Sequence, residues 1–219
     1  MISAALSFNY FLYLIIPAAF LLGSVPFGIL FTRSRGIDIR STGSKNIGAT
    51  NVLRAAGKAP ALMTLAGDLL KGALSVMLCR VIIMNLNLGD QPPEFAVTVE
   101  DLWMGIAGLA AVLGHMFSVF LSFKGGKGVA TGFGVLLVYS PLVAGIMLLV
   151  WLSVAFIFRY SSLAAIIAVA AMPFMLALFK SSAIKITFGI LLAVLIIFKH
   201  RANIRNIIAG TESGIGKNN

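Results

Sequence analysis

Long apolar runs separated by short polar segments dominate the sequence. A helix that crosses a bilayer needs about 20 mainly apolar residues, so these runs predict membrane-spanning helices. Proline or a charged or polar pair ends the later runs. The pattern predicts an all-α polytopic membrane protein with about seven transmembrane helices, over residues 10–32, 60–86, 102–123, 128–139, 141–158, 163–179 and 184–198. If the short segments are fused or discounted, five helices remain.

Composition supports this class, because 59% of the residues are hydrophobic and only 11% are charged. A chain of 219 residues has room for one helical bundle, so we expect a single integral-membrane domain over residues 1–219. The lone cysteine, Cys79, excludes an intrachain disulfide and a cysteine-rich metal site. No lysine or arginine precedes Arg33. The first run therefore lacks the basic leader of a signal peptide and is expected to be a retained helix.

The net charge of +10 is distributed unevenly between the loops. Residues 33–58 hold six basic side chains and one acid, whereas residues 87–101 hold four acids, Asp90 among them, and no base. Loops rich in lysine and arginine stay in the cytoplasm, which predicts an outside N-terminus and, with seven helices, a cytoplasmic C-terminus. Lys180 and Lys185 then fall on the outer side, against the rule. Membrane topology and anionic ligands explain the basic charge, and no nucleic-acid partner is expected.

Three polar stretches interrupt the apolar sequence, at residues 38–54, 122–131 and 199–212, and the topology places all three at the cytoplasmic face. In the first, glycines allow backbone N–H groups to approach an anion closely. Arg54 offers a planar fork that matches phosphate oxygens. A loop that only fixed topology would not need such donors. The neutral donors are Ser44, Asn46, Thr50 and Asn51.

The second stretch contains Lys124-Gly125-Gly126-Lys127-Gly128 before a predicted helix. A glycine-rich turn that enters a helix N-terminus beside lysines forms an anion site. It is not a Walker A loop, because Gly128 follows Lys127 where that motif has serine or threonine. The alternative is a tight hairpin whose lysines reach toward water.

The third stretch places His200 and Asn203 on one face if it is helical. Taken alone, it fits a basic interfacial tail equally well. Asp68 and Lys71 also share a face, inside a predicted span, where ionisable residues mark either function or a structural pair. His115 lies near the cytoplasmic end of its helix and is expected to be a packed, hydrogen-bonded residue.

Several catalytic patterns are missing from the sequence. Neither histidine is followed five residues later by aspartate, and no Gly-x-Ser-x-Gly motif occurs. The carboxylates are too few and scattered for a di-metal site, so no metal and no cofactor is expected. An enzyme of this kind must use an activated substrate and supply positioning and charge stabilisation.

Short motifs run in order through nearly the whole chain. They are GSVPFG at 23–28, DIR at 38–40, GS at 43–44, NIGATN at 46–51 with Arg54, Asp68 with Lys71-Gly72, Gly114-His115, FKGGKG at 123–128, and His200-Arg201, Asn203-Ile204, Gly210 and Glu212. With these motifs the chain resembles the bacterial acyl-phosphate:glycerol-3-phosphate acyltransferase family (PlsY). The resemblance implies a multi-pass inner-membrane enzyme with its active site at the cytoplasmic face.

The resemblance also implies the reaction and the residues that perform it. An acyl group passes from acyl phosphate, not from acyl-CoA or acyl carrier protein, to the 1-hydroxyl of glycerol 3-phosphate, giving lysophosphatidic acid and phosphate. A soluble enzyme would supply the acyl phosphate. Lys45 stands where the family commonly has glycine, and Ser118 where proline is common. The implied catalytic residues are Ser44, Arg54, Lys127, His200 and Asn203; the substrate-binding residues are Asn46, Thr50, Asn51, Lys124, Gly125, Gly126, Gly128 and Arg201; the structural residues are Asp68, Lys71, His115 and Glu212.

Acyl phosphate is a mixed anhydride, so its phosphate is already a good leaving group. Catalysis needs two phosphates held side by side and their charge neutralised. The base is either His200 or a phosphate oxygen of the substrate. A phosphate or organophosphate transporter is the rival hypothesis, since it would also show basic half-sites and broken helices. It predicts polar residues on both sides of the bilayer and repeated halves, which the sequence lacks. A regulatory or scaffold membrane protein is a third hypothesis.

Overall fold

The computed structural model describes residues 1–86, 88 and 91–215, and within them every regular element is helical. Asp90 of the acidic loop lies outside the described residues. The helices are α1 Ile2–Ser7, η1 Tyr10–Leu14, α2 Ile15–Ser24, α3 Phe27–Arg33, α4 Ala49–Ala56, α5 Lys58–Met84, α6 Pro93–Met116, η2 Val119–Leu121, α7 Val129–Tyr139, α8 Pro141–Phe158, α9 Ser161–Leu178, α10 Ala183–Lys199 and α11 Arg201–Ile208.

The predicted all-helical membrane architecture is confirmed. Among the described residues, five helical segments are long and apolar enough to cross a bilayer, and α10 with α11, bent by 58°, forms a sixth candidate. α7 has 11 residues, about 16 Å at 1.5 Å per residue, and does not reach across about 30 Å of hydrocarbon. The count of seven transmembrane helices therefore stays a prediction.

Two of the differences from the predicted helices occur at proline. The first predicted helix is interrupted at Val25–Pro26, since proline lacks the N–H that would continue the hydrogen-bond ladder. The third begins at Pro93 rather than at residue 102. Proline at the first helical position is already set for a helix, and the acidic residues that follow extend the helix beyond the apolar run.

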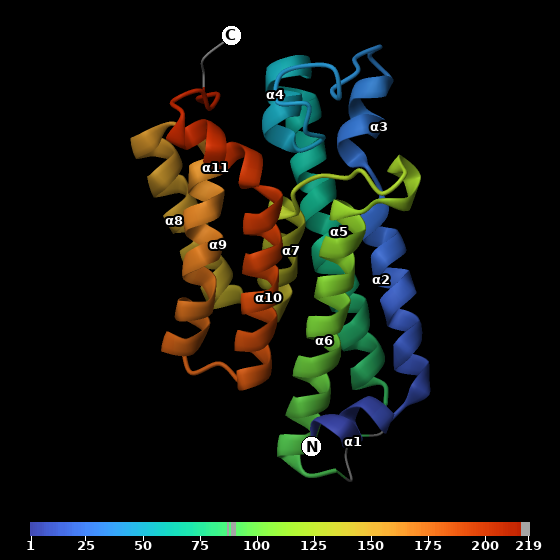
Figure 1. Ribbon diagram of the computed structural model, residues 1–219. Coiled ribbons are helices and arrows are strands. Elements are labelled where there is room, and N and C mark those ends of the chain that lie inside the picture. Colours follow the sequence, from blue (N-terminus) through green and yellow to red (C-terminus); the bar gives the residue numbers. More distant parts are fainter. Residues whose placement is uncertain (87, 89–90, 216–219) are drawn as a thin grey trace.

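The chain runs back and forth between two ends of the bundle (Figure 1). α3, α4 and α11 lie at the upper end, the loop before α7 lies in the upper half, and α1 lies at the lower end. The N-terminus and the last described residues are thus at opposite ends, and the three polar stretches share one end. Which end faces the cytoplasm stays a prediction from loop charge.

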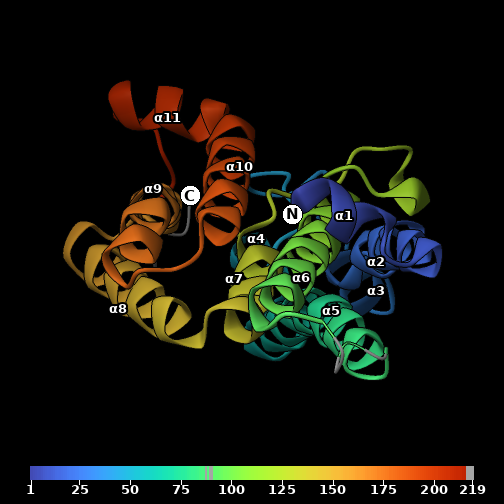
Figure 2. The same cartoon turned by 90° about the horizontal axis from the view of Figure 1, so that it is seen from below.

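Close helix contacts hold α7 in the centre of the bundle. A methyl group added to Gly72 of α5 would lie 2.1 Å from the carbonyl oxygen of Thr131, and one added to Gly134 would lie 2.0 Å from that of Leu69. Small residues let helix backbones approach closely where there is no hydrophobic drive for helices to associate. Seen from below, α7 stands between α5 and α6 on one side and α8, α9 and α10 on the other (Figure 2).

Lys185 is one of the two lysines that the topology places on the outer side, against the charge rule. It forms an ion pair with Asp101 at the lower end of the bundle. Its Nζ lies 3.2 Å from Oδ1 of Asp101, whose Oδ2 accepts a 2.6 Å hydrogen bond from Ser182. The Nζ also lies 5.3 Å from the centre of the Tyr139 ring. These contacts account for a lysine on the predicted outer side, because its charge is neutralised by a buried carboxylate.

Candidate active site

Residues from all three polar stretches line one cavity of about 780 Å³ at the upper end of the bundle. Its polar part is lined by loop 43–51, α4, the start of α7 and the α10–α11 junction. The predicted site residues that line it are Ser44, Asn46, Thr50, Asn51, Arg54, Asp68, His115, Lys127, Gly128, His200, Asn203 and Glu212.

The buried side chain of Asn51 forms hydrogen bonds with the backbone of the first polar stretch. Its side-chain nitrogen lies 3.0 Å, 3.1 Å and 2.8 Å from the carbonyl oxygens of Ile39, Thr42 and Asn46. Its side-chain oxygen accepts a 3.0 Å hydrogen bond from the backbone N–H of Ser44. Asn51 thus fixes the loop that carries Ser44.

Lys45 occupies a turn whose backbone conformation favours glycine. Its φ is +56°, in the left-handed region that costs a residue with a side chain about 1 kcal/mol. The loop holds this turn although position 45 carries a side chain, because the neighbouring backbone at Ser44 and Asn46 is hydrogen-bonded to Asn51.

The glycine-rich loop is seated on the C-terminal end of α6. The N–H groups of Gly125 and Gly126 donate to the carbonyls of Met116 and His115 at 3.1 Å and 3.0 Å. A methyl group on Gly125 would lie 2.0 Å from the His115 carbonyl oxygen. Gly128 has φ +87° and caps α7, which begins at the next residue as the glycine-rich turn predicted. Only glycine at these positions lets the loop lie flat on α6.

Lys127 is linked to the third stretch through a chain of side chains. Its Nζ donates to Oδ1 of Asn203, and the Asn203 amide donates to Oε1 of Glu212 at 2.7 Å. Ser162 donates to the same Glu212 oxygen at 2.6 Å. Burial lowers the pKa of Lys127, and Glu212 opposes part of that shift while Arg54 adds to it. These hydrogen bonds hold the amino group of Lys127 in the wall of the cavity.

Arg54 holds the segment that follows α11. One guanidinium nitrogen, Nη2, donates to the carbonyls of Ser213 and Gly214 at 3.0 Å and 3.2 Å. The backbone N–H of Ile215 donates to the carbonyl of Arg159 at 2.6 Å and fixes the segment to the α8–α9 turn. Arginine has five N–H donors, so Nε and Nη1 remain to bind an anion.

His200 lies buried at the junction of α10 and α11. Its Nδ1 is 2.8 Å from the Ile196 carbonyl oxygen. Because a carbonyl only accepts, the hydrogen bond assigns the proton to Nδ1, and the neutral ring then has Nε2 as an acceptor. The third stretch is therefore more than a basic tail, since it supplies this acceptor and Asn203 to the same cavity.

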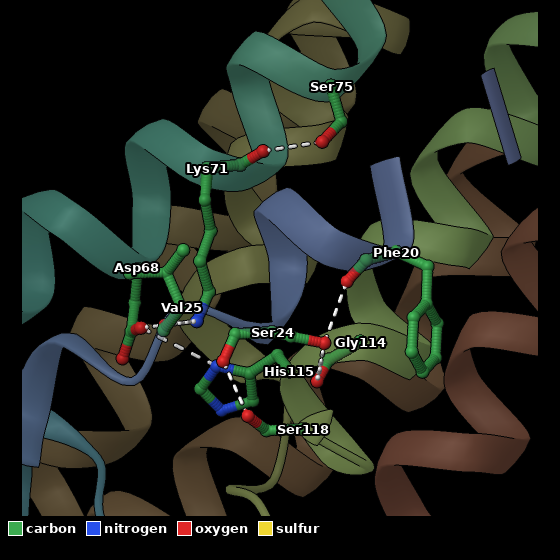
Figure 3. A network of polar contacts seen from close by, with 9 residues as sticks. All are labelled: Phe20, Ser24, Val25, Asp68, Lys71, Ser75, Gly114, His115 and Ser118. Carbon is green, nitrogen blue, oxygen red and sulfur yellow. Dashed lines mark hydrogen bonds and ion pairs between the residues drawn. The ribbon is translucent and has the colours of Figure 1, made fainter. Parts of the chain in front are cut away.

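Asp68, Lys71 and His115 form a buried ionic cluster (Figure 3). Asp68 Oδ1 lies 2.7 Å from Lys71 Nζ and 3.5 Å from His115 Nδ1. Lys71 also donates to the Val25 carbonyl at 2.9 Å, which the break at Pro26 leaves without a helical partner. A methyl group on Gly126 would lie 2.2 Å from His115 Nε2, so the cluster extends from the broken helix to the loop.

Replacing Asp68 by asparagine is expected to lower the free energy of unfolding by about 3–5 kcal/mol, because a buried lysine loses its counter-ion. The measurement is thermal unfolding in detergent micelles. Glu100→Gln is the matched control, because it breaks an exposed 3.0 Å pair with Arg80 and is expected to cost about 1 kcal/mol or less. Equal effects of the two substitutions would show that the buried pair is not stabilising.

Four predicted substrate-binding residues do not line the cavity. Lys124 is exposed, and its hydrogen bonds are made by its backbone, whose carbonyl accepts from Arg40 at 3.0 Å and whose N–H donates to Leu121 at 3.0 Å. Gly125 and Gly126 face α6, and Arg201 is exposed and lies over the Phe198 ring at 4.7 Å. Within the described part of the chain, no three His, Cys, Asp or Glu side chains gather as metal ligands.

Two serines were missed by the sequence analysis. Ser162 donates to Glu212, and Ser161 lies 3.2 Å from the Thr50 hydroxyl, so both join the cavity wall to the other stretches. The polar break at 159–162 was interpreted only as a helix end. The predicted topology places this break at the same membrane face as the three polar stretches, and that position could have indicated a role in the site.

Below the polar end, the cavity continues between apolar side chains of α7, α8, α9 and α10. Leu65 of α5 and Leu148 of α8 also line it and are 43% and 42% exposed. The cavity therefore joins a polar, cationic upper part to an apolar lower part.

Comparison with known proteins agrees with this geometry. A family described as glycerol-3-phosphate acyltransferase matches residues 13–210. The glycerol-3-phosphate acyltransferase of Geotalea daltonii is 46% identical over 199 residues, covering 91% of this chain and 95% of the relative. That of Neisseria meningitidis is 41% identical over 203 residues, covering 92% and 96%.

Solved structures give the same result. The chain is similar to the crystal structure of PlsY (YgiH), an integral membrane glycerol 3-phosphate acyltransferase, in its glycerol 3-phosphate form, with a TM-score of 0.82 and 36% identity over 94% of this chain and 96% of that one. The lysophosphatidic acid form gives a TM-score of 0.80. With motifs, fold and family match in agreement, the chain belongs to the glycerol-3-phosphate acyltransferase family of integral membrane enzymes.

Proposed function

We propose that the enzyme takes its acyl group from acyl phosphate and transfers it to the 1-hydroxyl of glycerol 3-phosphate. The observation that supports this proposal is one cavity in which a cationic end with Arg54 and Lys127 continues into an apolar channel. Both substrates carry a phosphate, and only the donor carries a long hydrocarbon chain. The glycerol 3-phosphate and lysophosphatidic acid forms of the PlsY structures correspond to such an acceptor and product.

Arg54, Lys127 and Ser44 hold the two phosphates, together with the open N-terminal end of α7. His200 Nε2 and Asn203 orient glycerol 3-phosphate. The acceptor hydroxyl attacks the acyl carbonyl carbon, the bond from that carbon to the phosphate oxygen breaks, and phosphate leaves. The hydroxyl proton passes to His200 or directly to a phosphate oxygen, and the released phosphate carries it away. Fixed cations and donors stabilise the charge that shifts during transfer.

Asn46, Thr50 and Asn51 shape the first loop around the phosphates. Asp68, Lys71 and His115 hold the glycine-rich loop from below, and Glu212 positions Asn203 and so Lys127. Lys124 and Arg201 are exposed and contribute positive charge near the polar end of the cavity. They do not contact the substrates directly.

The cationic end faces the cytoplasm in this proposal, in a bacterial inner membrane, because loop 33–58 is basic and the opposite loop is acidic. A soluble enzyme on that side supplies acyl phosphate.

The test is phosphate release by purified protein in detergent, given palmitoyl phosphate with and without glycerol 3-phosphate, and without metal or coenzyme A. We expect release that depends on glycerol 3-phosphate and forms lysophosphatidic acid. Palmitoyl-CoA in a parallel reaction tests the donor. Transfer from the thioester alone would overturn the donor assignment. No transfer from either donor, with glycerol 3-phosphate uptake into liposomes, would favour a transporter instead.

A further inference from the structure

We propose that Met147 of α8 and Met172 of α9 form the floor of the apolar channel and set the longest acyl chain that the enzyme transfers. The inference rests on the proposed function, because it assigns the lower cavity to the acyl chain. It adds a specificity determinant to that function.

The channel ends on four buried side chains from four helices. Leu136, Met147, Met172 and Leu192 are 5%, 4%, 2% and 3% exposed, and all four line the cavity. The helices that carry them, α7, α8, α9 and α10, stand around a common centre when seen from below (Figure 2). The lower end of the channel is therefore enclosed by protein rather than open to lipid.

The depth of the channel follows from the positions of its lining residues along α9. Met172 lies ten residues below Ser162, which contacts Glu212 at the polar end. At 1.5 Å per residue the channel is about 15 Å deep along α9. One leaflet of bilayer hydrocarbon is about 15 Å thick, half of about 30 Å. A channel of this depth accepts the long acyl chains that fill a leaflet.

Below Met172, the space between α9 and α10 is already filled by side chains. The side chain of Leu176, one turn beyond Met172, would lie 2.5 Å from a methyl group on Gly189 of α10. Leu176 is fully buried and does not line the cavity. α9 and α10 therefore close directly beneath Met172, and a longer chain has nowhere to go unless the floor gives way.

Methionine makes this floor deformable, because its unbranched side chain has three rotatable bonds. We expect a gradual decline in transfer with increasing chain length. Shortening either methionine deepens the channel, and enlarging one makes it shallower.

The experiment supplies an equimolar mixture of lauroyl, palmitoyl, stearoyl and arachidoyl phosphate with glycerol 3-phosphate and measures the lysophosphatidic acids by mass spectrometry. Met172→Ala is expected to raise the stearoyl-to-palmitoyl product ratio about fourfold for each further methylene buried. Met147→Ala, on another helix, is expected to shift it in the same direction. Met172→Trp is expected to lower the palmitoyl-to-lauroyl ratio at least fourfold.

Met104→Ala is the matched control, because Met104 of α6 is equally buried at 4% but does not line the cavity. It is expected to leave the product ratios unchanged. If Met172→Ala and Met147→Ala both form products with unchanged stearoyl-to-palmitoyl ratios, the inference is overturned and the proposed function stays intact. An equal shift in the Met104 variant would also overturn it. If the unaltered enzyme forms no product from any of the four donors, both the proposed function and the inference fail.

Discussion

Replacing Lys127 by methionine is expected to lower kcat for acyl transfer by about 10²- to 10³-fold, the usual cost of one fixed donor in a site that stabilises developing charge. Methionine keeps the length and apolar contacts of the side chain but removes the amino group that reaches Asn203. Phosphate release under saturating substrates measures the loss.

Lys58→Met is the control, because Lys58 is an exposed lysine at the same end of the bundle that does not line the cavity. It is expected to retain normal turnover. The unaltered enzyme should also lose activity as the pH rises, at a pH below the usual pKa of lysine, because burial lowers the pKa of Lys127 and the charged form is needed. Normal turnover of the Lys127 variant would remove it from the phosphate site.

The Gly125→Ala variant is expected to lose about 10²-fold in kcat/KM. The new methyl group would lie 2.0 Å from a backbone oxygen of α6, so the loop has to rise. A displacement of about 1 Å near reacting groups can cost this much. The loop carries Lys127, and its movement separates that lysine from Asn203.

Gly145→Ala provides the comparison, because a methyl group there meets nothing within 4 Å. This exposed position in α8 tolerates alanine and is expected to gain about 0.5–1 kcal/mol of helix stability without losing transfer. If the Gly125 variant matched it in kcat/KM, the tight seating of the loop would be irrelevant to catalysis.

The helices were predictable because lipid demands long apolar runs, and residues 141–158 were placed at their true ends. α4 was missed, since its eight residues begin within a polar stretch and carry no long apolar run. Likewise, the start of α6 was set too late because its first turns carry the acids Glu94, Glu100 and Asp101. Hydropathy finds the part of a helix that lies in hydrocarbon and not its extension into the interface.

The chemistry of the site was predictable from residue types, whereas contacts between distant segments were not. The sequence grouped Ser44, Lys127 and His200 at one face, and the cavity brings them together. Nothing in it indicated that Lys124 would point away while Lys127 joined Asn203, because both flank the same glycines.

The residues of the channel floor also could not be predicted from the sequence. Met147 and Met172 lie in helices that are apolar all round, so the pattern cannot separate side chains that face lipid from those that face a cavity. That distinction depends on how α7, α8, α9 and α10 pack, which is a tertiary property.

The contact of Arg54 with Ser213 and Gly214 has a consequence for biosynthesis. Those two residues follow every helix that the structure describes, so a ribosome adds them after all of these helices have been made. A nascent chain can therefore have its full bundle inserted while Arg54 still lacks the carbonyls that fix it. The Arg54 contacts therefore form only after all of the described helices have been synthesised.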